Sequence, residues 1–217
     1  MQLSDRPLIV IDSGLGNVKS VSHAFRRIGE EARVESDPPA EASIDRYALV
    51  VLPGVGSFDR GIDNLRERGW VEWLRMCVQS QTPILGLCLG MQLLCEGSDE
   101  GERQGLGFIS GKFERFVFAN QGSERLKVPH MGWNYVRFDP DRAPWSGDPR
   151  ERRRFYFVHS YRLPADESSS AVGWADYGGA FTAAIAKDRV IGLQFHPEKS
   201  HRFGTDLLRG IVNWARA

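Results

Sequence analysis

Three apolar runs, each followed by turn residues or a helical pattern, constrain the fold of this chain most strongly. They occupy residues 8–11, 48–52 and 83–87, and the first stops at Asp12 while the second stops at Pro53. Continuous apolar runs of this length indicate strands that are buried on both faces. Such strands, alternating with helices, predict an α/β fold with a mostly parallel central sheet and helices on both faces.

Apolar residues recur at helical spacing between these predicted strands. Residues 18–28 have this spacing, and residues 65–78 have a helical pattern that Gly69 interrupts. Residues 90–95 are expected to begin another helix, and apolar positions over 207–215 predict the buried face of a closing helix.

The C-terminal half has a β-rich pattern. Short strands are expected at residues 113–118, 135–138, 155–158, 181–186 and 190–195. Between the second and third of these, residues 139–154 are rich in proline, aspartate and arginine and predict a long loop. We therefore expect a single domain over residues 1–217, with the β-rich part as an insertion.

Composition excludes several classes of protein. The chain has 28 Lys and Arg against 28 Asp and Glu, and this balance argues against a nucleic-acid binder. The first apolar run is too short for a signal peptide or a membrane span. Cys77, Cys88 and Cys95 make an odd count without C-x-x-C spacing, so we expect a cytoplasmic protein with neither a disulfide framework nor a metal site.

One cysteine has a sequence context that suits a nucleophile. Gly86-Leu87-Cys88-Leu89-Gly90 has the form Gly-x-nucleophile-x-Gly between a predicted strand and a predicted helix, as a nucleophile elbow requires. The glycines allow a tight turn, and a helix N-terminus favours the thiolate of Cys88. The backbone N–H of Leu89 can then face an oxyanion. The alternative is a small core residue, which is the interpretation preferred for Cys77 and Cys95.

A histidine and a carboxylate form a second candidate group. His196 and Glu198 follow the last predicted strand, in the segment Gln194-Phe195-His196-Pro197-Glu198. Functional groups of parallel sheets collect beyond the carboxyl ends of strands, so His196 can meet Cys88 there. Glu198 can orient the imidazole and stabilise its cation, which completes a nucleophile, a base and an acid. A loop histidine without function is the alternative. A structural or surface role is the interpretation preferred for the four other histidines: His23, His130, His159 and His201.

A glycine-containing turn follows the strand predicted at 48–52. In Pro53-Gly54-Val55-Gly56, the glycines permit a backbone N–H to point toward the nucleophile and to complete an oxyanion hole with Leu89. A tight turn without function is the alternative. Gly14-Leu15-Gly16 matches part of a dinucleotide-binding motif, but Lys19 stands where the third glycine belongs. A nicotinamide cofactor is therefore rejected, and no cofactor is expected.

The order and approximate spacing of these motifs resemble those of the class I glutamine amidotransferases over nearly the whole chain. The motifs that carry the resemblance are Pro53-Gly54-Val55-Gly56, Gly86-Leu87-Cys88-Leu89-Gly90-Met91-Gln92 and Phe195-His196-Pro197-Glu198. More narrowly, residues 12–17, 129–134, 157–161 and 196–200 are similar to those of glutaminase subunits of imidazole glycerol phosphate synthases, from histidine biosynthesis. Ser13 departs from the aromatic residue expected in the first of these segments.

The resemblance implies a glutaminase that works through a Cys88 thioester, with His196 and Glu198 as the other catalytic residues. It also implies that Gln92, Glu100, Ser160 and Tyr161 bind glutamine. The ammonia would pass to a (β/α)₈-barrel cyclase subunit, which makes imidazole glycerol phosphate and AICAR, in a heterodimer with this chain. Three residues resemble positions at that interface: Trp133, Tyr156 and Lys199. For these the alternatives are core aromatic residues and a solvated charge.

Other functions stay open at the level of the sequence. One is an amidotransferase subunit for another acceptor, such as a surface sugar, whose glutaminase half would look alike. Another is a Cys-His-Glu hydrolase that acts on esters or peptides, and a third is a binding module that keeps the fold without the activity.

Overall fold

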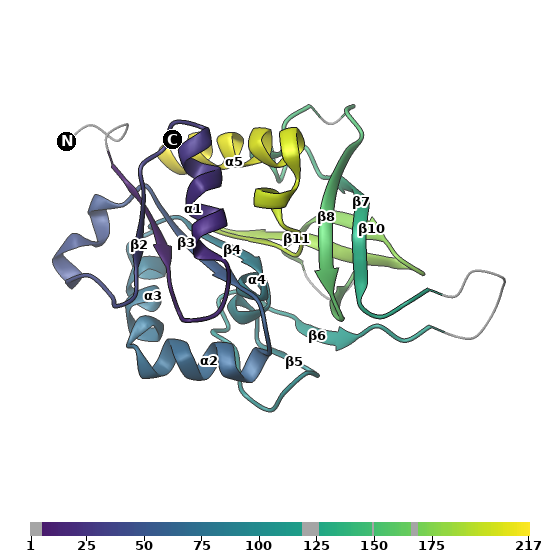
Figure 1. Cartoon of the computed structure of the whole chain (residues 1–217), viewed down its shortest axis with the longest axis horizontal. Coiled ribbons are helices and arrows are strands. Elements are labelled where there is room, and N and C mark those ends of the chain that lie inside the picture. The colour runs from purple at the N-terminus through teal and green to yellow at the C-terminus, as the bar shows by residue number, and fades with distance from the viewer. Residues whose placement is uncertain (1–5, 119–125, 149, 166–168) are drawn as a thin grey trace.

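The computed structural model describes residues 6–118, 126–148, 150–165 and 169–217, and within these ranges one connected sheet of twelve strands forms the centre of the molecule (Figure 1). Nine strands follow one another across the sheet in the order β2 (Ala32–Glu35), β1 (Leu8–Ile11), β3 (Leu49–Gly54), β4 (Ile84–Cys88), β12 (Val190–Leu193), β11 (Ala180–Lys187), β10 (Ala171–Asp176), β7 (His130–Phe138) and β8 (Arg153–His159). Three strands branch from this path: β5 (Gly97–Ser98), β6 (Lys112–Arg115) and β9 (Tyr161–Pro164).

The first five strands of this order are parallel to one another, which confirms the mostly parallel central sheet predicted from the apolar runs. Alternate residues of β1 enter two separate hydrophobic cores, with Leu8 and Val10 on one face and Ile9 and Ile11 on the other. All four side chains are fully buried, and burying a side chain of this size contributes roughly 1.5–3 kcal/mol. This double burial explains why the run is apolar throughout.

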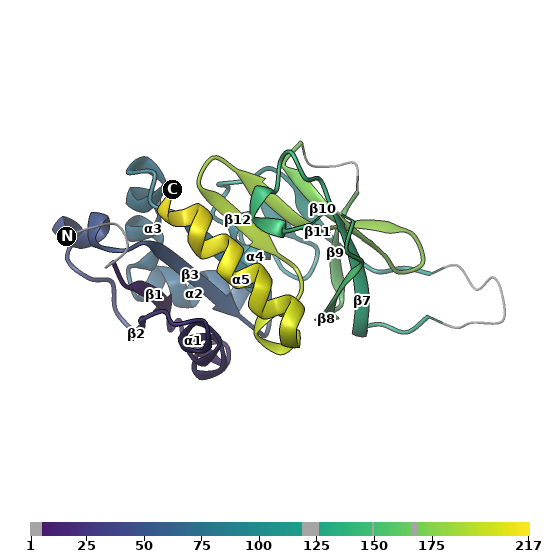
Figure 2. The same ribbon diagram turned by 90° about the horizontal axis from the view of Figure 1, so that it is seen from above.

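Helices cover both faces of the parallel strands (Figure 2). One face packs against α1 (Val18–Arg27) and α5 (His201–Arg216), and the other packs against α2 (Phe58–Glu67), α3 (Trp70–Gln79) and α4 (Leu89–Leu94). The single helix expected at 65–78 is wrong, because the segment belongs to α2 and α3. Gly69 separates the two helices in a left-handed conformation, with φ 76°.

The β-rich C-terminal half is antiparallel, and β7 and β8 stand at the right of Figure 1 as a ribbon that extends from the sheet. Strand β7 begins five residues before the predicted strand, at His130, while β12 ends two residues early, at Leu193. Residues 194–196 therefore leave the parallel sheet, and the backbone N–H of His196 instead donates to the carbonyl of Tyr156 in β8 at 2.9 Å. This contact brings the ribbon next to the end of β12.

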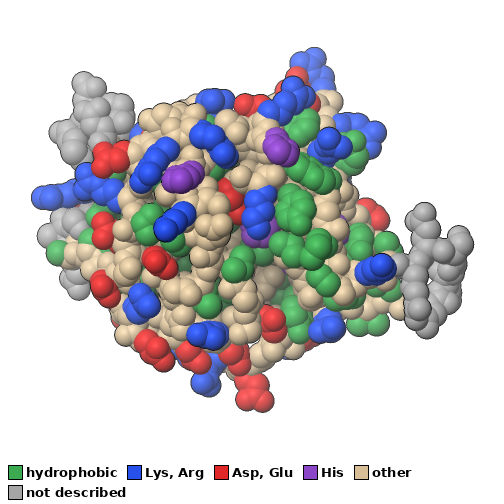
Figure 3. Space-filling model, in the orientation of Figure 1, with side chains coloured by type: hydrophobic (Ala, Val, Ile, Leu, Met, Phe, Trp, Pro, Cys, Tyr) green, Lys and Arg blue, Asp and Glu red, His purple; other side chains and the backbone are tan. Residues whose placement is uncertain are grey.

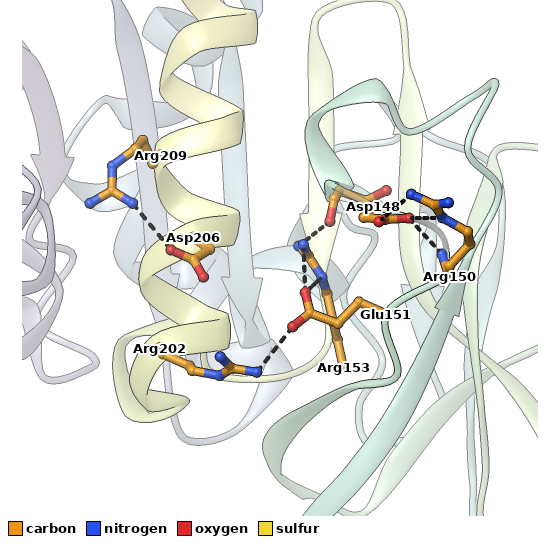
Figure 4. A network of polar contacts seen from close by, with 8 residues as sticks. Asp148, Arg150, Glu151, Arg153, Arg202, Asp206 and Arg209 are labelled. Carbon is orange, nitrogen blue, oxygen red and sulfur yellow. Dashed lines mark hydrogen bonds and ion pairs between the residues drawn. The ribbon is translucent and has the colours of Figure 1, made fainter.

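Polar contacts fasten the connection between β7 and β8 to helix α5 (Figure 4). The Glu151 carboxylate accepts hydrogen bonds from Arg153 and from Arg202 of α5, each at 3.0 Å. Arg153 is buried and also donates to the carbonyl of Ser146, at the end of the short 3₁₀ helix η3 (Pro144–Ser146). The loop predicted at 139–154 is thus ordered where it is described, while residue 149 lies outside the described residues.

Two further 3₁₀ helices, η2 (Glu41–Arg46) and η4 (Pro197–Lys199), complete the described elements. No helix within the described ranges is both long enough and apolar enough to cross a membrane.

Candidate active site

Cys88 is the last residue of β4, and α4 begins at the next residue. Its backbone has φ 54° and ψ −108°, a conformation that residues other than glycine avoid at a cost of roughly 1–3 kcal/mol. The sharp reversal from strand to helix places the sulfur at the N-terminus of α4. Cys88 therefore occupies the turn that the Gly-x-nucleophile-x-Gly pattern predicts.

The two glycines around Cys88 are required by the close approach of neighbouring backbone. A Cβ at Gly90 would lie 1.8 Å from the carbonyl oxygen of Leu52 in β3. A Cβ at Gly86 would lie 2.7 Å from the carbonyl oxygen of Gly90. Both distances are far below van der Waals contact, so any larger residue would push α4 away from the sheet.

His196 and Glu198 form a buried pair just beyond β12. Nδ1 of His196 donates to Oε1 of Glu198 at 2.8 Å, and their side chains are only 4% and 5% exposed. Nε2 of His196 has no hydrogen-bond partner among the described residues. Burial alone would lower the pKa of His196, but the negative charges of Cys88 and Glu198 raise it to about 10. The raised pKa favours the imidazolium form of His196, which can give a proton to a leaving group.

The sulfur of Cys88 has two further neighbours that the sequence analysis did not assign to the site. Nε2 of Gln194 donates to the sulfur at 3.8 Å, and the carbonyl oxygen of Val158 lies 3.9 Å from it. Gln194 lies two residues before His196, and this position in the same segment is the one feature of the sequence that could have assigned Gln194 to the site.

A cavity of about 280 Å³ opens beside the sulfur. It brings together eight residues that the sequence predicted, which are Val55, Gly56, Cys88, Leu89, Gln92, Glu100, Ser160 and Tyr161. Three more residues complete the wall: Pro129, Val158 and His159. This volume suits a small ligand such as a free amino acid.

Other predicted residues lie outside this cavity. His196, Glu198 and Gly54 line a separate space of about 20 Å³, together with Val55, which borders both spaces. Gly54 pairs in register with Cys88 across β3 and β4, so the turn that follows Gly54 runs beside the nucleophile. Within this turn, Val55 is 43% exposed and Gly56 has φ 113°. Val55, Gly56 and Leu89 thus line the same cavity as the sulfur.

Glu100 holds a fixed place at the cavity wall. Its Oε2 accepts a hydrogen bond from the backbone N–H of Phe58 at 2.9 Å, at the N-terminus of α2. A carboxylate at this position is stabilised by the helix dipole. This hydrogen bond fixes the orientation of the carboxylate beside the cavity.

Two buried histidines support the far wall of the cavity. Nδ1 of His159 lies 2.7 Å from the carbonyl of Tyr161 and must donate to it, so its Nε2 accepts from Nδ1 of His130 at 3.0 Å. Burial lowers the pKa of His130 to about 4 and that of His159 to about 3, which keeps both rings neutral. The pair therefore fastens the backbone around Ser160. This arrangement agrees with a structural role for both histidines, but no local pattern in the sequence predicts that they pair.

The three residues predicted for the interface lie together, with Trp133 in β7, Tyr156 in β8 and Lys199 in η4. Trp133 is 42% exposed, and its ring contacts the edge of Tyr156, with centroids 6.1 Å apart. Nζ of Lys199 lies 5.9 Å from the centroid of the Tyr156 ring. Met131 and Tyr135 are exposed on the same face of β7. We call Met131, Trp133, Tyr135, Tyr156 and Lys199 the ribbon surface.

The two other cysteines lack the features of Cys88. Both are buried, and burial raises the pKa of Cys77 to about 12 and raises that of Cys95 as well. Among the described residues, no group of three or more His, Cys, Asp or Glu side chains is placed to hold a metal ion.

Comparisons with known proteins agree with this geometry. The family model "Glutamine amidotransferase class-I" matches residues 9–212. A protein of Methanococcus maripaludis named "Imidazole glycerol phosphate synthase subunit HisH 2" is 43% identical over 96% of this chain and 100% of its own length. A protein of Sulfurimonas denitrificans named "Imidazole glycerol phosphate synthase subunit HisH" is 42% identical over 95% and 98%. The solved structure "Structure of PurLQS from Thermotoga maritima" has the same fold, with a TM-score of 0.72 at 20% identity over 96% of this chain and 99% of that one. Because the family model covers almost the entire chain and the relatives are more than 40% identical over nearly their full length, the chain belongs to the class I glutamine amidotransferases.

Proposed function

We propose that this chain is the glutaminase subunit of an imidazole glycerol phosphate synthase, which hydrolyses glutamine to glutamate and ammonia. The observation that carries the proposal is that Cys88, in its strained turn, lines a cavity of about 280 Å³ and raises the pKa of His196, which is paired with Glu198. The names of the full-length relatives support the specific assignment.

The first half of the reaction releases ammonia. Glutamine enters the cavity with its amino group toward Glu100 and its side-chain amide toward Cys88, where Gln92, Ser160 and Tyr161 line the wall. The thiolate attacks the amide carbon, and the carbonyl electrons move to the oxygen, which the N–H groups of Leu89 and of residues 54–56 bind. When the oxyanion collapses, the C–N bond breaks and the imidazolium gives its proton to the departing nitrogen.

The second half releases glutamate. The neutral imidazole of His196 now takes a proton from water, which attacks the thioester carbon. The C–S bond breaks, glutamate leaves, and Cys88 is again a thiolate beside an imidazolium. Glu198 stabilises that cation in both halves through its hydrogen bond to Nδ1.

A partner must collect the ammonia, because in water ammonia is protonated and loses its nucleophilicity. We propose that a (β/α)₈-barrel cyclase subunit docks on the ribbon surface in a heterodimer. Hydrophobic side chains gather there around a hollow, over β7 and β8 (Figure 3). Exposed aromatic residues beside cationic groups are typical of protein interfaces. The odd number of cysteines supports a cytoplasmic location.

The decisive experiment measures glutamate release by the purified chain, with and without the cyclase subunit. We expect weak release by the chain alone, strong activation by the cyclase bound to its substrate, and ammonia-dependent formation of imidazole glycerol phosphate. An electrophilic glutamine analogue should label Cys88 with one equivalent. Hydrolysis of esters without hydrolysis of glutamine, or labelling of Cys77 or Cys95, would refute the proposal. Activation by a different acceptor enzyme would refute the specific assignment alone.

A further inference from the structure

A fully buried amide is in contact with the nucleophile. The Gln194 side chain is 0% exposed, and its Nε2 donates to the sulfur of Cys88 at 3.8 Å. The other end of the amide is also occupied, because Oε1 accepts from Nε2 of Gln92 at 3.2 Å. Burying a polar side chain is unfavourable unless it makes hydrogen bonds, and here one of these bonds goes to the reacting atom.

The backbone holds Gln194 at this distance. In the parallel pairing of β12 with β4, Leu193 lies opposite Leu87. Gln194, the residue just after β12, therefore follows beside Cys88, the last residue of β4. The N–H of Gln194 also donates to the carbonyl of Ala183 in β11 at 2.9 Å. The amide is thus preorganised by the sheet and does not depend on a mobile loop.

The two protonation states of the sulfur need different partners. A thiol can donate to the carbonyl of Val158 at 3.9 Å, whereas a thiolate accepts hydrogen bonds only and gains nothing from that carbonyl. The amide N–H of Gln194 can bond the thiolate, and hydrogen bonds to an ionised group are stronger than neutral ones. The opposite orientation of the amide would place Oε1 against the sulfur and repel the thiolate.

We propose that Gln194 is a hydrogen-bond donor that stabilises the thiolate of Cys88, and that Gln92 orients it. This inference rests on the proposed function in that Cys88 is taken as the nucleophile. Gln194 would then join Cys88, His196 and Glu198 as a fourth side chain of the site, in contact with the reacting sulfur.

The test is the pH dependence of alkylation of the full chain by iodoacetamide, in which the thiolate forms a C–S bond and iodide leaves. Gln194→Met keeps the size of the side chain but removes the donor. Gln194→Glu keeps an acceptor for Gln92 and places an acid at the sulfur. Gln79→Met, at the exposed C-terminal end of α3, is the matched control.

With the donor removed, we expect the midpoint of the profile of Gln194→Met to lie about one pH unit higher, with about tenfold slower alkylation at pH values below both midpoints. Gln194→Glu should shift the midpoint at least as far, and Gln79→Met should match the unmodified chain. Mass spectrometry must place the label on Cys88 alone, because labelling of Cys77 or Cys95 would reveal unfolding.

A profile of Gln194→Met or of Gln194→Glu that superimposes on that of the unmodified chain would overturn the inference. The assay needs neither glutamine nor the partner. Failure to hydrolyse glutamine would therefore refute the proposed function and leave the alkylation result standing.

Discussion

Replacing Gly90 by alanine tests whether close backbone packing positions the nucleophile. Gly90 lies in the first turn of α4, two residues after Cys88, against strand β3. Helix propensity alone favours the change, since alanine is about 1 kcal/mol better than glycine within a helix. The structure predicts the opposite outcome, because the new Cβ would lie 1.8 Å from the carbonyl oxygen of Leu52.

The size of the effect follows from this distance. The oxygen belongs to the backbone of a buried strand and cannot rotate away, so α4 must move by at least ~1.2 Å before the contact reaches 3.0 Å. Overpacking of a core costs about 1–3 kcal/mol or more, which exceeds the gain in helix propensity. A displacement of about 1 Å at a catalytic group can also reduce the rate about 10²-fold.

The assays are unfolding in urea and glutamine hydrolysis in the presence of the cyclase. We expect Gly90→Ala to lower the free energy of unfolding by about 2 kcal/mol and kcat by about 10²-fold. The matched control is Gly97→Ala in β5, where the new Cβ meets nothing closer than Cγ of Lys112 at 3.9 Å. If Gly90→Ala is as stable and as active as Gly97→Ala, the steric argument is wrong.

Three further predictions concern the acid, the buried histidines and the ribbon surface. Glu198→Gln removes the carboxylate that stabilises the catalytic imidazolium, and kcat for glutamine should fall by about 10²–10⁴-fold in steady-state assays; an unchanged kcat would contradict this role. Burial lowers the pKa of His130 to about 4 and of His159 to about 3, so the unfolded chain binds more protons than the folded chain as pH falls below 6.5. The free energy of unfolding should therefore decrease by roughly 5 kcal/mol between pH 6.5 and pH 4, measured in urea, with about half of that decrease in His159→Asn; equal decreases would count against the neutral pair. Trp133→Ala should weaken cyclase binding about 30-fold by calorimetry, whereas Val34→Ala, at an exposed site on β2, should not; equal affinities would place the interface elsewhere.

Local patterns determined much of this protein. The run at residues 8–11 is strand β1 with the predicted bounds, since a strand buried on both faces needs apolar residues at every position. The turn around Cys88 was also predictable, because the flanking glycines, the preceding strand and the following helix are neighbours in the chain. The bounds of β7 and β12 were not, because the ends of these strands depend on their pairing partners.

The contacts around the sulfur were decided by the tertiary structure. The pairing of β12 with β4 places Gln194 beside Cys88, and the pairing of β3 with β4 places Gly54 there. The register of β7 with β8 sets His130 opposite His159. No local pattern records these distances, since a shift of one residue in register would turn each side chain to the other face of the sheet. The local sequence around each of these groups predicts its chemistry. Contact between the groups depends instead on the strand register, and burial of both faces of the whole sheet selects one register.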